Sequence, residues 1–134
     1  MKEKLDLLLE RSVSTYFDYP VAAILECDDG TLFYGVNVET ASPQAGICAE
    51  RNAIFSAISN GYKKENFKKI YLKAKTNKEL YPCFICRQAL VELCNLDMEI
   101  VIYYDDTMKS VTVKELTPYS FSGDDLKWEL VLLV

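Results

Sequence analysis

The chain has 134 residues, 50% of them hydrophobic, and a formal net charge of −5 from 20 acidic and 15 basic residues. Its length suits one globular domain with a buried core, so we predict a single domain over residues 1–134. The negative charge argues against nucleic acid as a partner, because a polyanion is bound by positive surfaces. The apolar stretches 5–9 and 128–134 are too short for a membrane span or a signal peptide, so we expect no membrane partner and a cytoplasmic location.

The first half of the chain predicts a helix, a β-hairpin and a second helix. Apolar side chains recur at helical spacing near the start, at Leu5, Leu8, Leu9, Val13 and Tyr16. Two apolar runs, 21–25 and 32–38, flank a turn signal at Asp28-Asp29-Gly30, which is typical of a hairpin. A helix between Cys48 and Gly61 is predicted from one apolar face, formed by Ala49, Ala53, Ile54, Ala57 and Ile58.

The second half alternates strands and helices. Residues 70–74 alternate as in a strand, and a helix is predicted after Pro82, with Cys86, Leu90, Leu93 and Cys94 on one stripe. Residues 100–104 and 110–113 are predicted to form two further strands, before a short helical tail. Alternation of helices and strands in the middle of the chain implies a partly parallel sheet between helices.

Five cysteines and no histidine restrict the chemistry that this chain can perform. An odd number of cysteines without a secretory signal argues against a disulfide framework. The absence of histidine excludes Ser-His and Cys-His mechanisms and metal sites with histidine ligands. A metal ion would therefore be held by thiolates or carboxylates.

Three cysteines stand at the predicted starts of two helices: Cys48, and the pair Cys83 and Cys86 that follows Pro82. Helix N-termini stabilise thiolates through unpaired N–H groups and a positive dipole end. Three thiolates on zinc leave the fourth position to a water molecule, whose pKa the metal lowers, as in catalytic zinc sites. Glu50 is close enough to act as general acid and base on that water. Cys-x-Glu followed by Pro-Cys-x-x-Cys is the signature of zinc deaminases that act on bases.

Two other interpretations of the cysteines stay open. A Cys-x-x-Cys pair alone would suit redox chemistry, but it would leave Cys48 and Glu50 without a role. A structural zinc site would recruit a fourth ligand, for which Cys27 and Cys94 are the candidates. Both of these are better interpreted as small buried hydrophobic residues.

These motifs resemble the cytidine deaminases, specifically the small homotetrameric, zinc-dependent type with three cysteine ligands. The resemblance covers most of the chain in five separated stretches, 21–23, 37–39, 46–53, 82–88 and 115–126. It implies an α/β fold, a three-layer α-β-α sandwich around a mixed five-stranded sheet. It also implies one zinc ion per chain and hydrolytic deamination of cytidine or deoxycytidine to uridine or deoxyuridine, a reaction of pyrimidine salvage that releases ammonia.

The resemblance further implies which residues contact the substrate. Asn37 and Glu39 match positions that bind the ribose hydroxyls. The backbone N–H of Ala49 matches the group that holds the pyrimidine carbonyl. Tyr19 stands where the family commonly has a phenylalanine that stacks on the base, and its ring can do the same. Glu50 matches the residue that transfers protons.

Three other matches concern the surroundings of the site. Arg51 matches a residue that hydrogen-bonds the zinc-bound sulfurs, where its charge would offset that of the thiolates. Phe121 and the carbonyl of Ala41 match groups that enter the site from a neighbouring subunit. The resemblance therefore implies a homotetramer with shared active sites, in which each site needs more than one chain.

Several positions depart from the usual pattern of the family. Thr40 replaces a frequent asparagine, Pro43 replaces a frequent tyrosine near the metal, and Phe84-Ile85 is bulkier than the usual pair between the two cysteines. These differences affect the substrate assignment more than the reaction, so a deaminase for a modified cytosine nucleoside, such as the blasticidin-type enzymes, stays open. A non-catalytic, zinc-stabilised nucleoside-binding protein is a third interpretation, against which the intact Glu50 argues.

Overall fold

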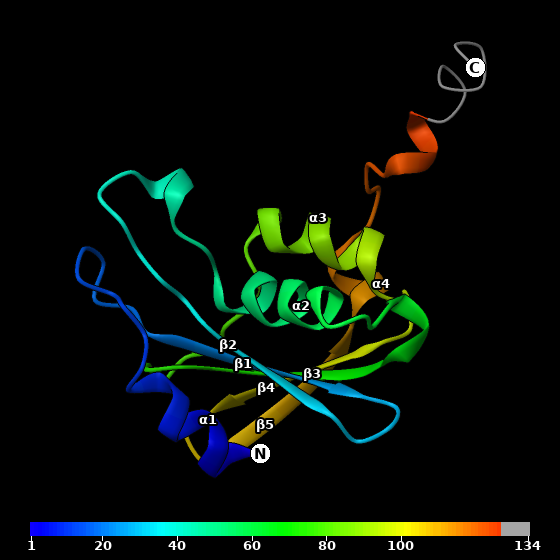
Figure 1. Cartoon of the computed structure of the whole chain (residues 1–134). Coiled ribbons are helices and arrows are strands. Elements are labelled where there is room, and N and C mark those ends of the chain that lie inside the picture. The colour runs from blue at the N-terminus through cyan, green and yellow to red at the C-terminus, as the bar shows by residue number, and fades with distance from the viewer. Residues whose placement is uncertain (127–134) are drawn as a thin grey trace.

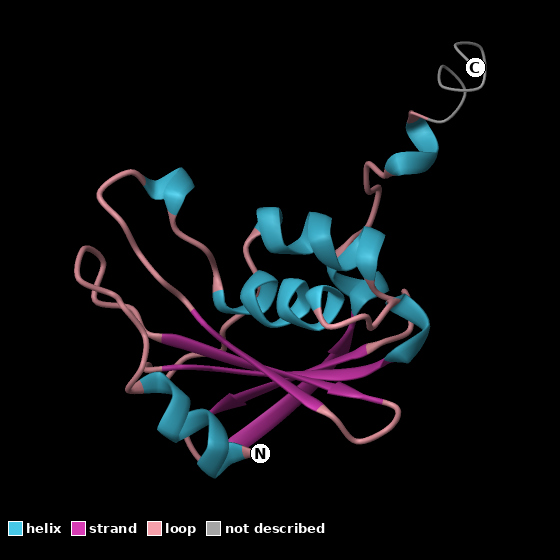
Figure 2. Cartoon of the chain, viewed as in Figure 1, coloured by secondary structure: helices cyan, strands magenta, loops and turns pink. Residues whose placement is uncertain are grey.

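A mixed five-stranded sheet forms the centre of the protein (Figure 2). Its strands are β1 (Val21–Cys27), β2 (Leu32–Val36), β3 (Phe67–Ala74), β4 (Glu99–Tyr104) and β5 (Thr107–Thr112). They lie in the order β2-β1-β3-β4-β5. The structure, a computed structural model, describes residues 1–126, so the apolar run 128–134 lies outside the described residues. β1 pairs antiparallel with β2 and β3, β3 pairs parallel with β4, and β5 pairs antiparallel with β4.

Helices cover both faces of this sheet (Figure 1). On one face, α1 (Lys2–Leu9) buries Leu5 and Leu8 against β1. On the other face, α2 (Ala49–Ser59) packs on β1 and β2, and α3 (Phe84–Leu93) packs against α2. The predicted three-layer α-β-α sandwich is therefore confirmed. No helix within residues 1–126 is long and apolar enough to span a membrane.

The main hydrophobic core lies between the sheet and the α2–α3 layer. Ala53 and Ala57 of α2 are fully buried, and their small side chains allow this helix to lie close to the strands. Ile58, predicted on the same face, is 40% exposed and lies off the buried side of the helix. Cys27 and Cys94 are both buried in this core, as predicted for small hydrophobic residues.

The predicted opening helix is too long, because α1 ends at Leu9. Val13, predicted as a helical residue, instead forms a parallel β-bridge with Val38. The backbone N–H of Val13 donates to the carbonyl of Asn37 at 3.1 Å, and its own carbonyl accepts from Glu39 at 2.7 Å. Long-range pairing with residues 37–39 thus replaces the helical hydrogen bonds that the apolar spacing predicted.

The second half agrees with the prediction in the order and type of its elements, but β3 begins three residues earlier, at Phe67, α3 ends before Cys94, and the last strand has other boundaries. Val113, predicted to end that strand, begins the short helix α4 (Val113–Leu116) instead. The reason is a capping box, in which the Thr112 hydroxyl accepts from the Glu115 backbone N–H at 3.2 Å and the Glu115 carboxylate accepts from the Thr112 N–H. Three short 3₁₀ helices complete the described fold, at Pro43–Ala45, Lys64–Asn66 and Gly123–Asp125.

Gly35 sets how closely β2 approaches the start of α2. A Cβ atom at this position would stand 2.2 Å from the Ala49 carbonyl oxygen and 2.6 Å from the Ala53 backbone nitrogen. Because both atoms belong to the backbone, a side chain here would displace the first turn of the helix. The absence of a side chain therefore fixes where α2 begins.

We predict that Gly35→Ala lowers the free energy of unfolding by about 1–3 kcal/mol, because overpacking forces backbone shifts. Urea denaturation followed by circular dichroism measures this change. Gly123→Ala is the control, since its Cβ would meet only the end of the Glu92 side chain, at 3.4 Å. A Gly35→Ala protein as stable as the control would contradict the close packing.

Candidate active site

The N-termini of α2 and α3 bring three thiols together. Cys48 is the N-cap residue of α2, Cys83 is the N-cap residue of α3, and Cys86 lies in the first turn of α3. Their Sγ atoms all lie within 4.8 Å of one another, and those of Cys48 and Cys83 are 3.7 Å apart. Sulfurs on a tetrahedral zinc ion, with bonds of about 2.3 Å, stand roughly 3.8 Å apart. The spacing of the thiols therefore fits one zinc ion.

The backbone around Cys48 holds its thiol in this position. Ile47, the preceding residue, exchanges two backbone hydrogen bonds with Val38, each 3.0 Å long. Gly46 approaches Val38 so closely that a Cβ atom there would stand 2.4 Å from the Val38 carbonyl oxygen. The chain entering α2 is thus fixed to the segment that follows β2.

No fourth protein ligand joins the cluster within residues 1–126. The group of metal-ligating side chains consists of the three thiols alone, and all five cysteines are unpaired. Cys27 and Cys94, the candidates for a closed structural site, lie in the hydrophobic core instead. The fourth position of a tetrahedral ion would therefore remain open, as catalysis requires.

Hydrogen bonds and positive charge around the thiols favour the thiolate form, which is the form that binds a metal ion. A hydrogen bond from Cys86 and the nearby Arg51 guanidinium lower the pKa of the Cys48 thiol to about 5. Arg51 Nη2 donates to Cys48 Sγ at 3.4 Å, and the Arg51 Nε is buried without a hydrogen-bond partner. Burial would lower the pKa of Arg51, but hydrogen bonds to the thiols raise it overall. Because the cluster already stabilises a thiolate, a zinc ion that replaces the remaining thiol protons fits these donors.

Glu50 is the one charged side chain that is buried among the described residues, with 4% of it exposed. Burial, assisted by the negative charge of Cys48, raises the pKa of its carboxyl group to about 7. A carboxyl group with this pKa is present in both protonation states near neutral pH. Glu50 therefore has the acid–base property that a proton-transferring group needs.

A cavity of about 330 Å³ opens over these groups. Most of the residues predicted for the site line it, namely Cys48, Cys83, Glu50, Ala49, Tyr19, Asn37 and Glu39. Phe17, Val21, Leu80 and Tyr81 line it as well, although the sequence assigned them no role. Leu80 and Tyr81 directly precede the Pro82-Cys83 motif, and Phe17 is two residues before Tyr19. Their closeness in sequence to predicted site residues could therefore have indicated that they line the cavity. The volume suits a small organic ligand.

Ala41 and Phe121 do not line this cavity in a single chain. Ala41 is exposed in the loop that follows β2. Phe121 is 57% exposed, and its carbonyl accepts from Gln88 Nε2 of α3 at 2.8 Å. One chain therefore does not bring these residues to Glu50, and the resemblance assigned both to a neighbouring subunit.

Comparison with known proteins identifies relatives along almost the whole chain. The family described as cytidine and deoxycytidylate deaminase zinc-binding region matches residues 1–103. A cytidine deaminase of Sporosarcina psychrophila is 35% identical over 120 residues, which cover 89% of this chain and 87% of the relative. A probable cytidine deaminase of Dictyostelium discoideum is 39% identical over 112 residues, covering 83% of this chain and 74% of the relative.

A solved structure agrees with these matches. The crystal structure of cytidine deaminase from Burkholderia pseudomallei superposes with a TM-score of 0.84 at 33% identity, and the alignment covers 89% of this chain and 94% of that chain. The region matched by the family includes all three clustered thiols. The fold, the thiol cluster and the comparisons agree on one conclusion: this chain belongs to the zinc-binding cytidine and deoxycytidylate deaminase family, with a site for one zinc ion per chain.

Proposed function

We propose that this chain catalyses the hydrolytic deamination of cytidine or deoxycytidine to uridine or deoxyuridine, with release of ammonia. One observation carries the proposal: the buried carboxylate of Glu50 lines the same cavity as the thiols of Cys48 and Cys83. A zinc-binding protein without catalytic activity would not require a buried carboxylate beside its metal ligands, because burying a charge is costly. The relatives named cytidine deaminases support the choice of substrate.

The three thiols would hold the zinc ion, and Arg51 would adjust their charge. When bound, zinc supplies a Lewis acid that lowers the pKa of a water molecule in the open fourth position. Arg51 donates to Cys48 Sγ, and its positive charge offsets part of the negative charge of three thiolates. This compensation would keep the metal strongly electrophilic.

Glu50 would move the protons. Its carboxylate accepts a proton from the attacking water and delivers it to the ring nitrogen beside the carbon that bears the amine, which makes that carbon more electrophilic. The water oxygen then bonds to this carbon, which becomes tetrahedral. Glu50 takes the second proton from the new hydroxyl group and delivers it to the amine. The carbon–nitrogen bond breaks, ammonia leaves and the carbonyl of uridine forms.

The cavity wall offers groups that match a nucleoside. The ring of Tyr19, 39% exposed, is available to stack on the base, and the backbone N–H of Ala49 would hold the pyrimidine carbonyl. Asn37 and Glu39 offer polar groups to the ribose hydroxyls. Thr40, Pro43, Phe84 and Ile85, which depart from the family pattern, do not line this cavity, whereas Tyr19 does. The choice of a plain cytosine nucleoside over a larger, modified one therefore rests on the relatives named cytidine deaminases.

We also propose that the protein is a cytoplasmic homotetramer that acts in pyrimidine salvage, with active sites shared between chains. Phe84 and Ile85 stand between two of the thiols, and Tyr119 and Phe121 are exposed near the same helix. Exposed apolar side chains in one region are typical of an interface. A second chain packed here would cover these side chains close to the metal ligands.

Glu50→Gln is predicted to keep zinc and to lose turnover by about 10³-fold or more, since the amide cannot carry protons. Turnover is measured by the absorbance change of cytidine, and zinc by elemental analysis. Glu65→Gln is the matched control, because Glu65 is exposed and distant in sequence from the thiols. Wild-type turnover in Glu50→Gln would remove Glu50 from the mechanism.

The same assay separates the candidate substrates. Cytidine and deoxycytidine should be converted, and a blasticidin-type nucleoside should not. Conversion of the antibiotic alone would favour the modified-nucleoside enzyme, and no conversion of any of them would favour the binding protein.

For the assembly, we predict that sedimentation gives four chains per particle. Ile85→Glu should dissociate the particle and lower activity while each chain keeps its zinc, because a buried unpaired charge disfavours the interface. Met108→Glu, on β5 and also exposed, should leave the assembly intact. A tetramer that tolerates Ile85→Glu would exclude this face of α3 as the interface.

A further inference from the structure

The segment between α1 and β1 forms one wall of the active-site cavity through Phe17 and Tyr19. We refer to residues 12–20 as the cavity segment. No side chain in it is buried, and Phe17 and Tyr16 are 74% and 59% exposed. Apolar packing therefore contributes little to its position, which depends on hydrogen bonds.

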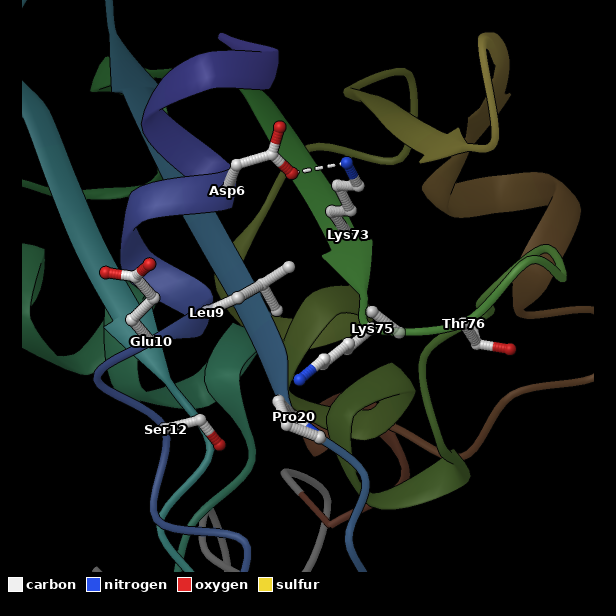
Figure 3. Close-up of a pocket in the computed structure, with 9 residues that line it drawn as sticks. Asp6, Leu9, Glu10, Ser12, Pro20, Lys73, Lys75 and Thr76 are labelled. Atoms are coloured by element: carbon white, nitrogen blue, oxygen red, sulfur yellow. Dashed lines mark hydrogen bonds and ion pairs between the residues drawn. The ribbon is translucent and has the colours of Figure 1, made fainter.

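A second open space lies on another side of the cavity segment. This hollow of about 590 Å³, between α1 and the end of β3, contains the ion pair of Asp6 and Lys73 (Figure 3). Ser12 and Pro20, the two ends of the cavity segment, also line this hollow and lie away from the ion pair (Figure 3). Because the cavity segment borders an open space on two sides, few side chains pack against it there.

Asn37 anchors both ends of the cavity segment. Its Oδ1 accepts from the backbone N–H of Val21 at 2.8 Å and from the hydroxyl of Ser12. Its Nδ2 donates to the carbonyl of Tyr19 at 2.9 Å. Both acceptor positions of the amide oxygen and one of its two N–H groups are thus occupied by the segment and by Val21, the residue that follows it, and one N–H remains for a ligand.

Glu39 anchors the middle of the cavity segment. Its Oε1 accepts from the backbone N–H groups of Tyr16 and Phe17, both at 2.9 Å, and its Oε2 accepts from the Ser14 hydroxyl at 2.8 Å. Desolvation would raise the pKa of the Glu39 carboxyl group, but these hydrogen bonds lower it overall. Three of about four acceptor positions of the carboxylate are therefore occupied within the protein.

Ser14 connects the two parts of this network. Its hydroxyl accepts from the Tyr19 backbone N–H at 2.6 Å while it donates to Glu39 Oε2. Its carbonyl accepts from the Asp18 N–H at 3.0 Å, which closes a turn in which Asp18 has the positive φ of 49°. A single hydroxyl group thus joins the residue proposed to stack on the base to the residue proposed to bind the ribose.

We infer that Ser14 is a positioning residue for substrate binding, whose hydroxyl holds Glu39 and Tyr19 in one preorganised wall of the nucleoside cavity. The inference rests on the proposed function, which gives those two residues their contacts with the substrate. Ser14 itself does not line the cavity. Its contribution is therefore made through its two partners.

Loss of the hydroxyl should affect binding and not the chemical step. Without it, the Tyr19 N–H and one Glu39 oxygen lose their shared partner, and the cavity segment samples other conformations. Substrate must then order the segment as it binds, which lowers affinity. The thiols and Glu50 belong to α2, α3 and their caps, and the Ser14 hydroxyl, whose partners are Glu39 and Tyr19, contacts none of them.

Ser14→Ala is predicted to raise KM for cytidine about 10-fold with kcat within about 2-fold of wild type, since weaker ground-state and transition-state binding changes KM alone. Ser14→Thr, which keeps a hydroxyl, should restore most of the affinity. Thr15→Ala is the control, because the hydroxyl of this exposed neighbour takes no part in the network. Steady-state kinetics on the zinc-loaded enzyme gives both constants.

Amide hydrogen exchange on the same proteins tests the network without turnover. In Ser14→Ala the amides of Tyr16, Phe17 and Tyr19 should exchange faster than in wild type and in Thr15→Ala. If these amides exchange at the same rate in Ser14→Ala as in wild type, the inference is wrong whatever the kinetic constants are. If they exchange faster but KM for cytidine is unchanged, Ser14 does not position the substrate-binding residues.

A wild-type chain that deaminates no cytosine nucleoside would overturn the proposed function and with it the substrate role of Ser14. The exchange data distinguish that outcome, because they do not depend on catalysis.

Discussion

The site depends on two helix N-termini that meet on one side of the sheet. Cys48 begins α2 and Cys83 begins α3, so unpaired backbone N–H groups of both helices favour thiolates at the same place. The sulfurs of Cys48 and Cys83, 3.7 Å apart, repel each other once they are ionised. A bound divalent cation would offset this repulsion. Arg51 Nη2 donates to Cys48 Sγ at 3.4 Å, so its positive charge would offset part of the negative charge of three thiolates on a bound zinc ion.

The position of Glu50 follows from the same packing. Because Glu50 lies in the first turn of α2, fixing the start of this helix also fixes the carboxylate beside the thiols. The close approach of Gly35 to Ala49 determines that start, and burial under the cavity raises the pKa of Glu50 to about 7. Close packing at a glycine in β2 thus allows Glu50 to lie beside the thiols. The cavity segment adds a wall that is held by hydrogen bonds to Glu39 instead of by packing.

Local sequence patterns predicted the layers and the thiol cluster, because helix starts, apolar runs and the two cysteine motifs are short-range signals. They failed where pairing with a residue far away in the sequence determines the local structure. The apolar spacing that begins at Leu5 continues to Val13, yet Val13 pairs with Val38 and the helix ends early. Ser14 and Glu39 are likewise 25 residues apart, and neither residue alone indicates that they share a hydrogen bond. Phe17 in the cavity wall was missed because its role depends on that network.

We expect three thiolates to hold the zinc ion while its fourth position stays open to solvent beside Glu50. X-ray absorption spectroscopy at the zinc edge, on the purified full chain, measures this directly. We expect three sulfur neighbours at about 2.3 Å and one oxygen or nitrogen neighbour at about 2.0–2.2 Å. Four sulfur neighbours would contradict it, because a closed shell of thiolates leaves no place for the water on which Glu50 acts.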